Sequence, residues 1–197
     1  MNYLAHAYLS FHDPGILTGN MISDFVKGKK QFDYPLQVQY GIRLHRAIDS
    51  FTDAHPVTKK AKELFKPVAG AYAGAFMDIV YDHFLATDSN EFSENTLSEF
   101  AATVYEQLTG QQELFPEKFA GMFPYMRSQN WLYNYRFPEG IEKSFGGLVR
   151  RAAYLHESAP AFAVFMANYP ALQELYGRFF PDVKKMALSQ FALFVNQ

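Results

Sequence analysis

Helical periodicity runs almost without interruption along this chain, and prolines divide it at positions where helices begin. A proline suits the first turn of a helix because its missing N–H would have no partner there. The strict alternation of apolar and polar residues that marks strands is absent from the sequence. The prolines that open or precede a periodic segment are Pro14, Pro35, Pro56, Pro116, Pro138, Pro160 and Pro170.

The periodicity predicts one all-α domain over residues 1–197, built as a multi-helix bundle. Helices are expected at about 2–12, 14–28, 35–54, 56–66, 70–87, 96–109, 116–128, 138–156 and 160–195. The last is expected to break at Pro170, with Pro181 as a second candidate break. Thr96 and Glu99 have the spacing of a capping box for the sixth helix.

Composition limits the kinds of site and of partner. The chain has no cysteine, so a metal must be held by His, Asp, Glu, Asn or water. A net charge of −2 provides no general attraction to nucleic acid or to an anionic membrane. No apolar run reaches the roughly 18 residues of a transmembrane helix, and no signal peptide is expected at the N-terminus. We therefore expect a soluble cytoplasmic protein; the oligomeric state stays open.

The segment 41–53 carries the most informative ionisable residues. His45, Asp49 and Asp53 are spaced by four, so they lie on one side of a helix, beside an apolar stripe that faces the core. Carboxylates that are partly buried need a cation or a dense hydrogen-bond network. Arg46, next to His45, is a candidate to neutralise a phosphoryl group. Asp53, near the end of the helix, suits a supporting or capping role better than a direct ligand.

A second segment repeats the spacing of four with Asp78 and Asp82, each flanked by bulky apolar residues, and continues with His83. Neighbouring residues on a helix diverge by about 100°, so Asp82 and His83 cannot both face one atom unless the helix lies edge-on to it. One of the two would then bind a metal and the other would support it. The alternative is a carboxylate that caps a helix or pairs with an arginine, and a core histidine with satisfied hydrogen bonds.

Two shorter segments complete the set. Asp24 follows Asn20 by four residues and is either a ligand or general base, or the partner of a nearby cation. His6 becomes a candidate only if it joins the other segments. Carboxylate and imidazole donors without thiolates suit Mn²⁺ or Mg²⁺, with Fe²⁺ as a further option. Such an ion polarises a phosphoryl oxygen and favours hydrolysis.

Taken together, the four segments resemble the acyl carrier protein phosphodiesterase (acyl carrier protein hydrolyase) family over about the first 136 residues. The shared patterns are Asn-x-x-x-His, Gly-Asn-x-x-x-Asp-Phe, Gly-Ile-x-x-His-Arg-x-Ile-Asp-x-x-Thr-Asp and Asp-x-x-x-Asp-His-Phe-Leu, in this order. The resemblance implies an all-helical relative of the HD-type metal phosphohydrolases that prefers manganese. It implies hydrolysis of the phosphodiester between 4′-phosphopantetheine and a serine of holo-acyl carrier protein, a reaction of lipid metabolism.

The matching positions are His6, Asp24, His45, Asp49, Asp78, Asp82 and His83. From them we assign metal ligation to His6, Asp24, Asp82 and His83. His45, Asp49 and Asp78 are then further ligands, base or support, and Arg46 contacts the phosphate. The HD dipeptide is absent, and Asp82–His83 stands in the reverse order.

Because acyl carrier proteins are acidic as a class, basic residues are candidates for docking the substrate, namely Lys27, Lys29, Lys30, Arg150 and Arg151. Two alternative functions remain. One is an HD-like phosphohydrolase of nucleotides or other small phosphoesters. The other is a non-catalytic helical protein that binds acyl carrier protein or a lipid-like ligand.

Overall fold

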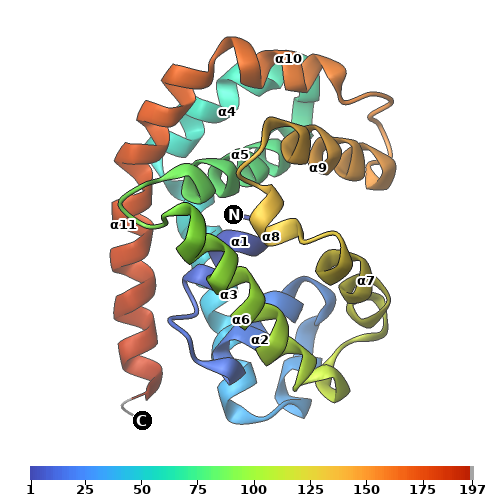
Figure 1. The fold of residues 1–197 in the computed structure, drawn as a ribbon, viewed down its shortest axis with the longest axis vertical. Helices are drawn as coiled ribbons and strands as arrows, with labels where there is room; N and C mark the ends of the chain where they lie inside the picture. The colour runs from blue at the N-terminus through green and yellow to red at the C-terminus, as the bar shows by residue number, and fades with distance from the viewer. Residues whose placement is uncertain (196–197) are drawn as a thin grey trace.

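The computed structural model describes residues 1–195, and within that range it contains helices and no strand, which confirms the predicted all-α fold (Figure 1). The α-helices are α1 (Tyr3–Tyr8), α2 (Pro14–Ile22), α3 (Leu36–Ala54), α4 (Pro56–Ala69), α5 (Ala73–Thr87), α6 (Glu94–Thr109), α7 (Glu117–Ser128), α8 (Trp131–Asn134), α9 (Pro138–Arg151), α10 (Ala159–Ala167) and α11 (Tyr169–Val195). Short 3-10 turns occupy η1 (Ser23–Phe25), η2 (Gly28–Asp33), η3 (Gly70–Tyr72) and η4 (Gln112–Leu114).

Most differences from the predicted helices lie at their ends. The first helix ends at Tyr8 because Phe11 and His12 adopt positive φ values of 50° and 64°, which no α-helix can contain. Helix α10 ends at Ala167 and α11 begins at Tyr169, so the break lies just before Pro170, close to its expected position. Pro181, in contrast, lies inside α11 without ending it. The turns η2 and η4 and the short α8 have too few residues to show a period.

Side chains cap several helix starts. Asp13 accepts a hydrogen bond from the backbone N–H of Ile16 at 2.8 Å and so caps α2. Helix α6 begins earlier than predicted, since Ser93 and Thr96 form the capping box there. The proposed pairing of Thr96 with Glu99 is therefore corrected, because Thr96 is the third residue of the helix and not its cap.

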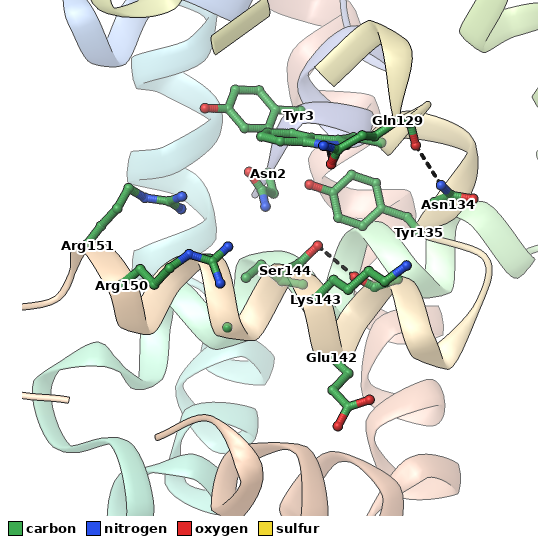
Figure 2. Close-up of a pocket in the computed structure, with 15 residues that line it drawn as sticks. Asn2, Tyr3, Gln129, Asn134, Tyr135, Glu142, Lys143, Ser144, Arg150 and Arg151 are labelled. Atoms are coloured by element: carbon green, nitrogen blue, oxygen red, sulfur yellow. Dashed lines mark hydrogen bonds between the residues drawn. The ribbon is translucent and has the colours of Figure 1, made fainter. Parts of the chain in front are cut away.

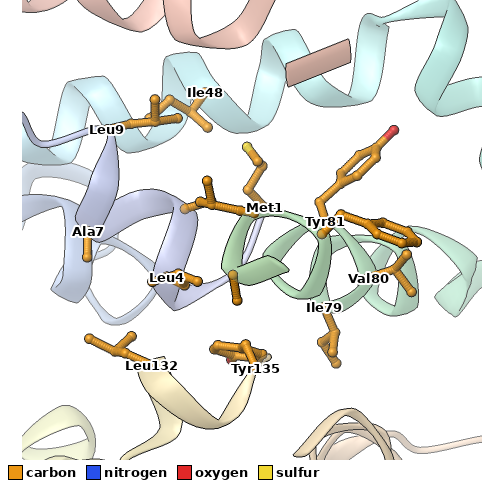
Figure 3. Close-up of a cluster of buried hydrophobic side chains, with 14 of the residues drawn as sticks. Met1, Leu4, Ala7, Leu9, Ile48, Ile79, Val80, Tyr81, Leu132 and Tyr135 are labelled. Carbon is orange, nitrogen blue, oxygen red and sulfur yellow. The ribbon is translucent and has the colours of Figure 1, made fainter. Parts of the chain in front are cut away.

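The first helix lies near the centre of the molecule, and α11 runs along one side of it (Figure 1). Figure 3 shows α1 and α5 between α3 on one side and α8 on the other. Leu4, Ile48 and Tyr81 are fully buried in this core. None of the helices in residues 1–195 combines the length and the apolar character needed to cross a membrane.

A carboxylate on α5 holds the start of α1. Asp82 accepts hydrogen bonds from the backbone N–H groups of Asn2, Leu4 and Ala5, at 3.1, 2.7 and 3.3 Å. The first N–H groups of a helix lack partners within it, and a negative charge there is favourable. The side chain of Asn2 makes no capping hydrogen bond of its own. A helix of six residues is unstable alone, so α1 depends on this contact with α5.

Candidate metal centre

Two histidines from different helices stack face to face. The rings of His6 on α1 and His45 on α3 have centroids 3.9 Å apart and planes inclined by 14°. Both side chains are buried. Their Nε2 atoms approach Asp49 on α3, with His6 Nε2 3.2 Å from Oδ1 and His45 Nε2 3.1 Å from Oδ2. One carboxylate therefore faces both imidazoles.

Asn20 on α2 orients both rings. The Nδ1 atom of His45 lies 2.8 Å from the backbone oxygen of Asn20, and Nδ1 of His6 lies 2.8 Å from its Oδ1. A carbonyl oxygen only accepts, so each Nδ1 carries the hydrogen. The amide of Asn20 is oriented independently, because its Nδ2 donates to the backbone oxygen of His6 at 2.8 Å. Each neutral ring therefore directs an Nε2 lone pair toward Asp49.

Lone pairs that face a carboxylate require a cation. While both rings are neutral, Nε2 of His6 and Nε2 of His45 are buried without a hydrogen-bond partner in the described part of the chain. A proton on Nε2 would let each ring donate a hydrogen bond to a neighbouring carboxylate. His6, His45 and Asp49 can each offer one ligand atom within 4.8 Å of the others. A donor set of two imidazoles and a carboxylate fits a divalent transition metal such as Mn²⁺ or Fe²⁺ better than Mg²⁺, which prefers oxygen ligands.

Asp24 lies at the open side of this cluster. It belongs to η1, and its Oδ1 is 3.3 Å from Nε2 of His45. Its side chain is 69% exposed, compared with 8% for His45, so solvent or a substrate reaches Asp24 directly. The hydrogen bond with His45 lowers the pKa of Asp24, which keeps the carboxylate ionised. Asp24 is thus the accessible donor of the cluster.

The electrostatics also favour one positive charge at this position. Burial disfavours protonation of His45, but hydrogen bonds to Asp24 and Asp49 outweigh it and raise the pKa of His45 to about 9. Burial and the neighbouring His45 lower the pKa of His6 to about 4. Burial opposes ionisation of Asp49, yet hydrogen bonds from His45 and His6 hold its pKa well below the usual range. The cluster therefore attracts a single cation, whether a proton or a metal ion.

Asp78 and Asp82 lie beside the cluster without joining it. The buried amino group of Met1 donates to Oδ1 of Asp78 at 2.9 Å and lies 3.4 Å from Oδ1 of Asp49. Burial raises the pKa of Asp78. Asp82 makes the backbone contacts at the start of α1 described above. Both carboxylates therefore position α1, which carries His6.

His83 is occupied elsewhere in the core. Its Nδ1 lies 2.7 Å from the backbone oxygen of Tyr135, and its Nε2 lies 2.8 Å from the hydroxyl of Tyr169. The ring also packs edge-on against Phe165. Because both nitrogens have partners, the structure does not bring His83 together with His6 or Asp24. Of the four residues assigned to metal ligation, the structure gathers only His6 and Asp24 around His45 and Asp49.

Arg46 and Asp53 make contacts outside the cluster. The guanidinium of Arg46 donates to Oε1 of Gln31 at 2.8 Å and to the backbone oxygen of Val26 at 3.1 Å. It therefore holds the segment that carries the lysines of η2. Asp53 pairs with Lys62 on α4. The supporting role expected for Asp53 agrees with this ion pair between neighbouring helices.

The residue with the largest organising role, Asn20, was not among the assigned site residues. The only signal in the sequence was its position in Gly-Asn-x-x-x-Asp-Phe, four residues before Asp24. Spacing alone does not reveal that a single asparagine contacts two histidines, one through its side chain and one through its backbone.

Comparison with known proteins places these residues in a family context. A family model described as acyl carrier protein phosphodiesterase matches residues 1–183. Proteins named acyl carrier protein phosphodiesterase from Klebsiella pneumoniae subsp. pneumoniae and from an Enterobacter species are 31% and 33% identical to the chain over 188 residues. Each of these alignments covers 95% of this chain and 97% of the relative. An Escherichia coli protein of the same name is 31% identical over the same share of both chains. No solved structure matches the chain.

Proposed function

The chain belongs to the acyl carrier protein phosphodiesterase family, and we propose that it hydrolyses the phosphodiester linking 4′-phosphopantetheine to a serine of holo-acyl carrier protein. The products are the apo-carrier and free 4′-phosphopantetheine. The observation that carries the proposal is the pair of buried Nε2 atoms facing Asp49, which is a site for a cation beside an accessible carboxylate.

The proposed ligands of a divalent cation are His6, His45 and Asp49, with Asp24 as the fourth donor on the open side. Manganese is proposed as the ion, with iron and magnesium as alternatives. When bound, the ion would supply Lewis acidity toward a phosphoryl oxygen and would favour ionisation of water. Asn20 keeps both Nδ1 atoms protonated, so both Nε2 lone pairs stay available.

Asp24 and Asp49 differ in their contacts and in their exposure to solvent. Asp49 faces two imidazoles and the amino group of Met1, so it holds the centre of the cluster. Asp24 is exposed, and its lowered pKa keeps the carboxylate ionised, so an oxygen is available to accept a hydrogen bond from water. We assign to Asp24 the role of orienting the attacking water.

The surface next to Asp24 is basic, which suits an acidic carrier protein. Lys27, Lys29 and Lys30 are exposed on and just before η2, two to five residues beyond the η1 turn that carries Asp24. Arg46 fixes this segment through Gln31 and Val26. Exposed cations mainly accelerate encounter with an oppositely charged partner. A docking role for the lysines is therefore proposed, with Arg46 as the residue that positions them.

The test is incubation of the purified protein with holo-acyl carrier protein, with EDTA or with added Mn²⁺. Mass spectrometry is expected to show loss of phosphopantetheine from the carrier with Mn²⁺ and no loss with EDTA. Asp49→Asn is expected to abolish the loss, since it removes a charged ligand. Asp182→Asn serves as the matched control, because Asp182 is exposed on α11 and contacts His55.

Three outcomes would contradict the proposal, in whole or in part. Absence of cleavage under every metal condition would exclude the reaction. Release of phosphate from a nucleotide panel, with the holo-carrier untouched, would favour a small-molecule phosphohydrolase. Full activity in EDTA, with Asp49→Asn active, would retain the reaction but exclude the metal centre.

A further inference from the structure

A cleft of about 810 Å³ opens between the start of α1, α8 and α9. Its volume lies within the range of roughly 300–1,000 Å³ typical of sites for small molecules. The cleft does not include His6, His45 or Asp49 in its lining. It is therefore separate from the metal centre, although α1 contributes residues to both.

Two arginines at the end of α9 face this cleft. Figure 2 shows Arg150 and Arg151 pointing from α9 toward Asn2 and Tyr3. Across residues 1–195, neither guanidinium takes part in an ion pair. A Cβ added to Gly147 would lie 3.6 Å from a guanidinium nitrogen of each arginine, so both groups lie over bare backbone of α9. Both side chains are exposed, and two cations without an anionic partner that face one cleft suit an anionic ligand.

The opposite wall is aromatic and rich in amides. Tyr135, Gln129 and Asn134 lie on it (Figure 2), and Trp131 also lines the cleft. The indole of Trp131 donates to Oε1 of Gln129 at 3.0 Å, which fixes the position of the ring. Glu142 points away from the other labelled side chains (Figure 2). Such a wall suits a narrow chain that carries amide groups and apolar segments, with an anion at one end.

Tyr3 connects the cleft to the metal centre. It lines the cleft and lies one turn before His6 on α1. Burial and the charge of Asp24 together raise the pKa of Tyr3 to about 12, and the charge of Arg151 opposes the increase. Tyr3 thus belongs to the part of α1 that links the cleft with His6 of the metal centre.

We propose that this cleft receives the pantetheine arm of the carrier-bound substrate, with Arg150 and Arg151 at the end that holds the phosphate. The arm is a linear chain with two amides and a terminal thiol, and a phosphodiester joins it to the carrier. With the phosphate between the arginines and the metal centre, the thiol end extends along α8 and the first turns of α9. This inference rests on the proposed function, and it assigns to Arg150 and Arg151 a contact with the prosthetic group rather than with the surface of the carrier.

The chain contains no cysteine, so one introduced thiol can report where the arm lies. Ser144 lines the cleft, and Ser98 lines a second hollow of about 570 Å³ beside α6. Ser144→Cys and Ser98→Cys are each converted to the mixed disulfide with 2-thiopyridine, in EDTA so that no cleavage occurs. The pantetheine thiol of a cysteine-free holo-carrier then attacks this disulfide, joins the protein and releases pyridine-2-thione, whose absorbance gives the rate.

Each rate is divided by the rate with free 2-mercaptoethanol, which corrects for the intrinsic reactivity of each position. We expect the corrected rate at Ser144→Cys to exceed that at Ser98→Cys by at least about tenfold, because binding raises the local thiol concentration. The ratio of the corrected rate at Ser144→Cys to that at Ser98→Cys is expected to fall about tenfold when Arg150→Ala and Arg151→Ala are added. Arg178→Ala, an exposed arginine on α11, is the matched control and is expected to leave it unchanged.

Equal corrected rates at the two positions would overturn the inference, as would an advantage that survives loss of both arginines. Neither result depends on catalysis. Cleavage of the holo-carrier by the wild-type protein, combined with equal exchange rates, would leave the proposed function standing and remove the cleft from it. Fast exchange at Ser144→Cys without cleavage under any metal condition would retain the cleft as the binding site of the arm and exclude the proposed reaction.

Discussion

Gly41 on α3 packs directly on Gly19 on α2. A Cβ added to Gly41 would lie 2.8 Å from the Cα of Gly19 and 2.1 Å from the backbone oxygen of Ile16. No side chain fits at this crossing, so the two helices approach as closely as their backbones allow. Asn20, the next residue on α2, thereby comes within 2.8 Å of His45 on α3. The crossing sets the distance between the asparagine and the histidine that it orients.

Gly41→Ala is expected to lower the free energy of unfolding by about 1–3 kcal/mol, because the added methyl group must push α2 away from α3. The same displacement is expected to weaken Mn²⁺ binding, since Asn20 would no longer hold His45. Urea unfolding in EDTA and calorimetric titration with Mn²⁺ measure the two effects separately. Gly121→Ala is the matched control: nothing lies within 4 Å of its added Cβ in α7, so it should be neutral or slightly stabilising. Equal stability of the two variants would contradict the proposed role of the crossing.

Asn20→Ala is expected to weaken Mn²⁺ binding about 10- to 100-fold. The variant removes the Oδ1 acceptor that fixes His6, while the backbone oxygen that fixes His45 remains. Ser10→Ala is the control, because its hydroxyl accepts from Nδ2 of Asn20 at 3.1 Å and donates to the backbone oxygen of His6 at 2.8 Å but contacts neither histidine ring. Titration calorimetry of both variants gives the comparison. An affinity that falls as much in Ser10→Ala as in Asn20→Ala would show that loosening of the local structure, and not the orientation of His6, causes the loss.

Asp82→Asn tests whether this carboxylate supports α1 or binds metal. In EDTA, we expect the variant to lose about 1–3 kcal/mol of unfolding free energy. The reason is that the amide offers one oxygen and a donor where the carboxylate accepts from Asn2, Leu4 and Ala5. A carboxylate that served only as a ligand would not stabilise the metal-free protein. Unchanged stability of Asp82→Asn in EDTA would therefore contradict the supporting role and favour Asp82 as a metal ligand.

The sequence was informative where one helix contains the whole pattern. The spacing of His45 and Asp49 places them on one face of α3. In the structure, Nε2 of His45 lies 3.1 Å from Oδ2 of Asp49. The same argument could not separate Asp49 from Asp82, since both are acidic residues within apolar helices. Their roles differ because α1 is too short to cap itself and takes its cap from α5, a contact between residues 77–80 positions apart. Periodicity within a helix carries no information on such contacts between helices.

His83 shows the same limit for a histidine. Its place next to Asp82 and its match to the family pattern favoured a ligand, yet Tyr135 and Tyr169 occupy its nitrogens. Tyr135 follows α8, and Tyr169 begins α11, so neither partner is near His83 in the chain. The alternative of a core histidine with satisfied hydrogen bonds describes its surroundings.

His83 should make the protein sensitive to acid. Burial lowers its pKa below the ordinary value of 6.5, so between those two values the unfolded chain binds a proton that the folded chain does not. Stability is then greatest above pH 6.5 and falls as the pH decreases, by at most about 1.4 kcal/mol per pH unit from this residue. His83→Gln, which has no titrating group, is expected to be less stable than wild type at pH 7.5 but to lose less stability on acidification. Urea unfolding at intervals from pH 7.5 to 5, in EDTA, measures the difference. His156→Gln, at an exposed position, should follow the wild-type curve, and a constant gap between His83→Gln and wild type at every pH would refute the prediction.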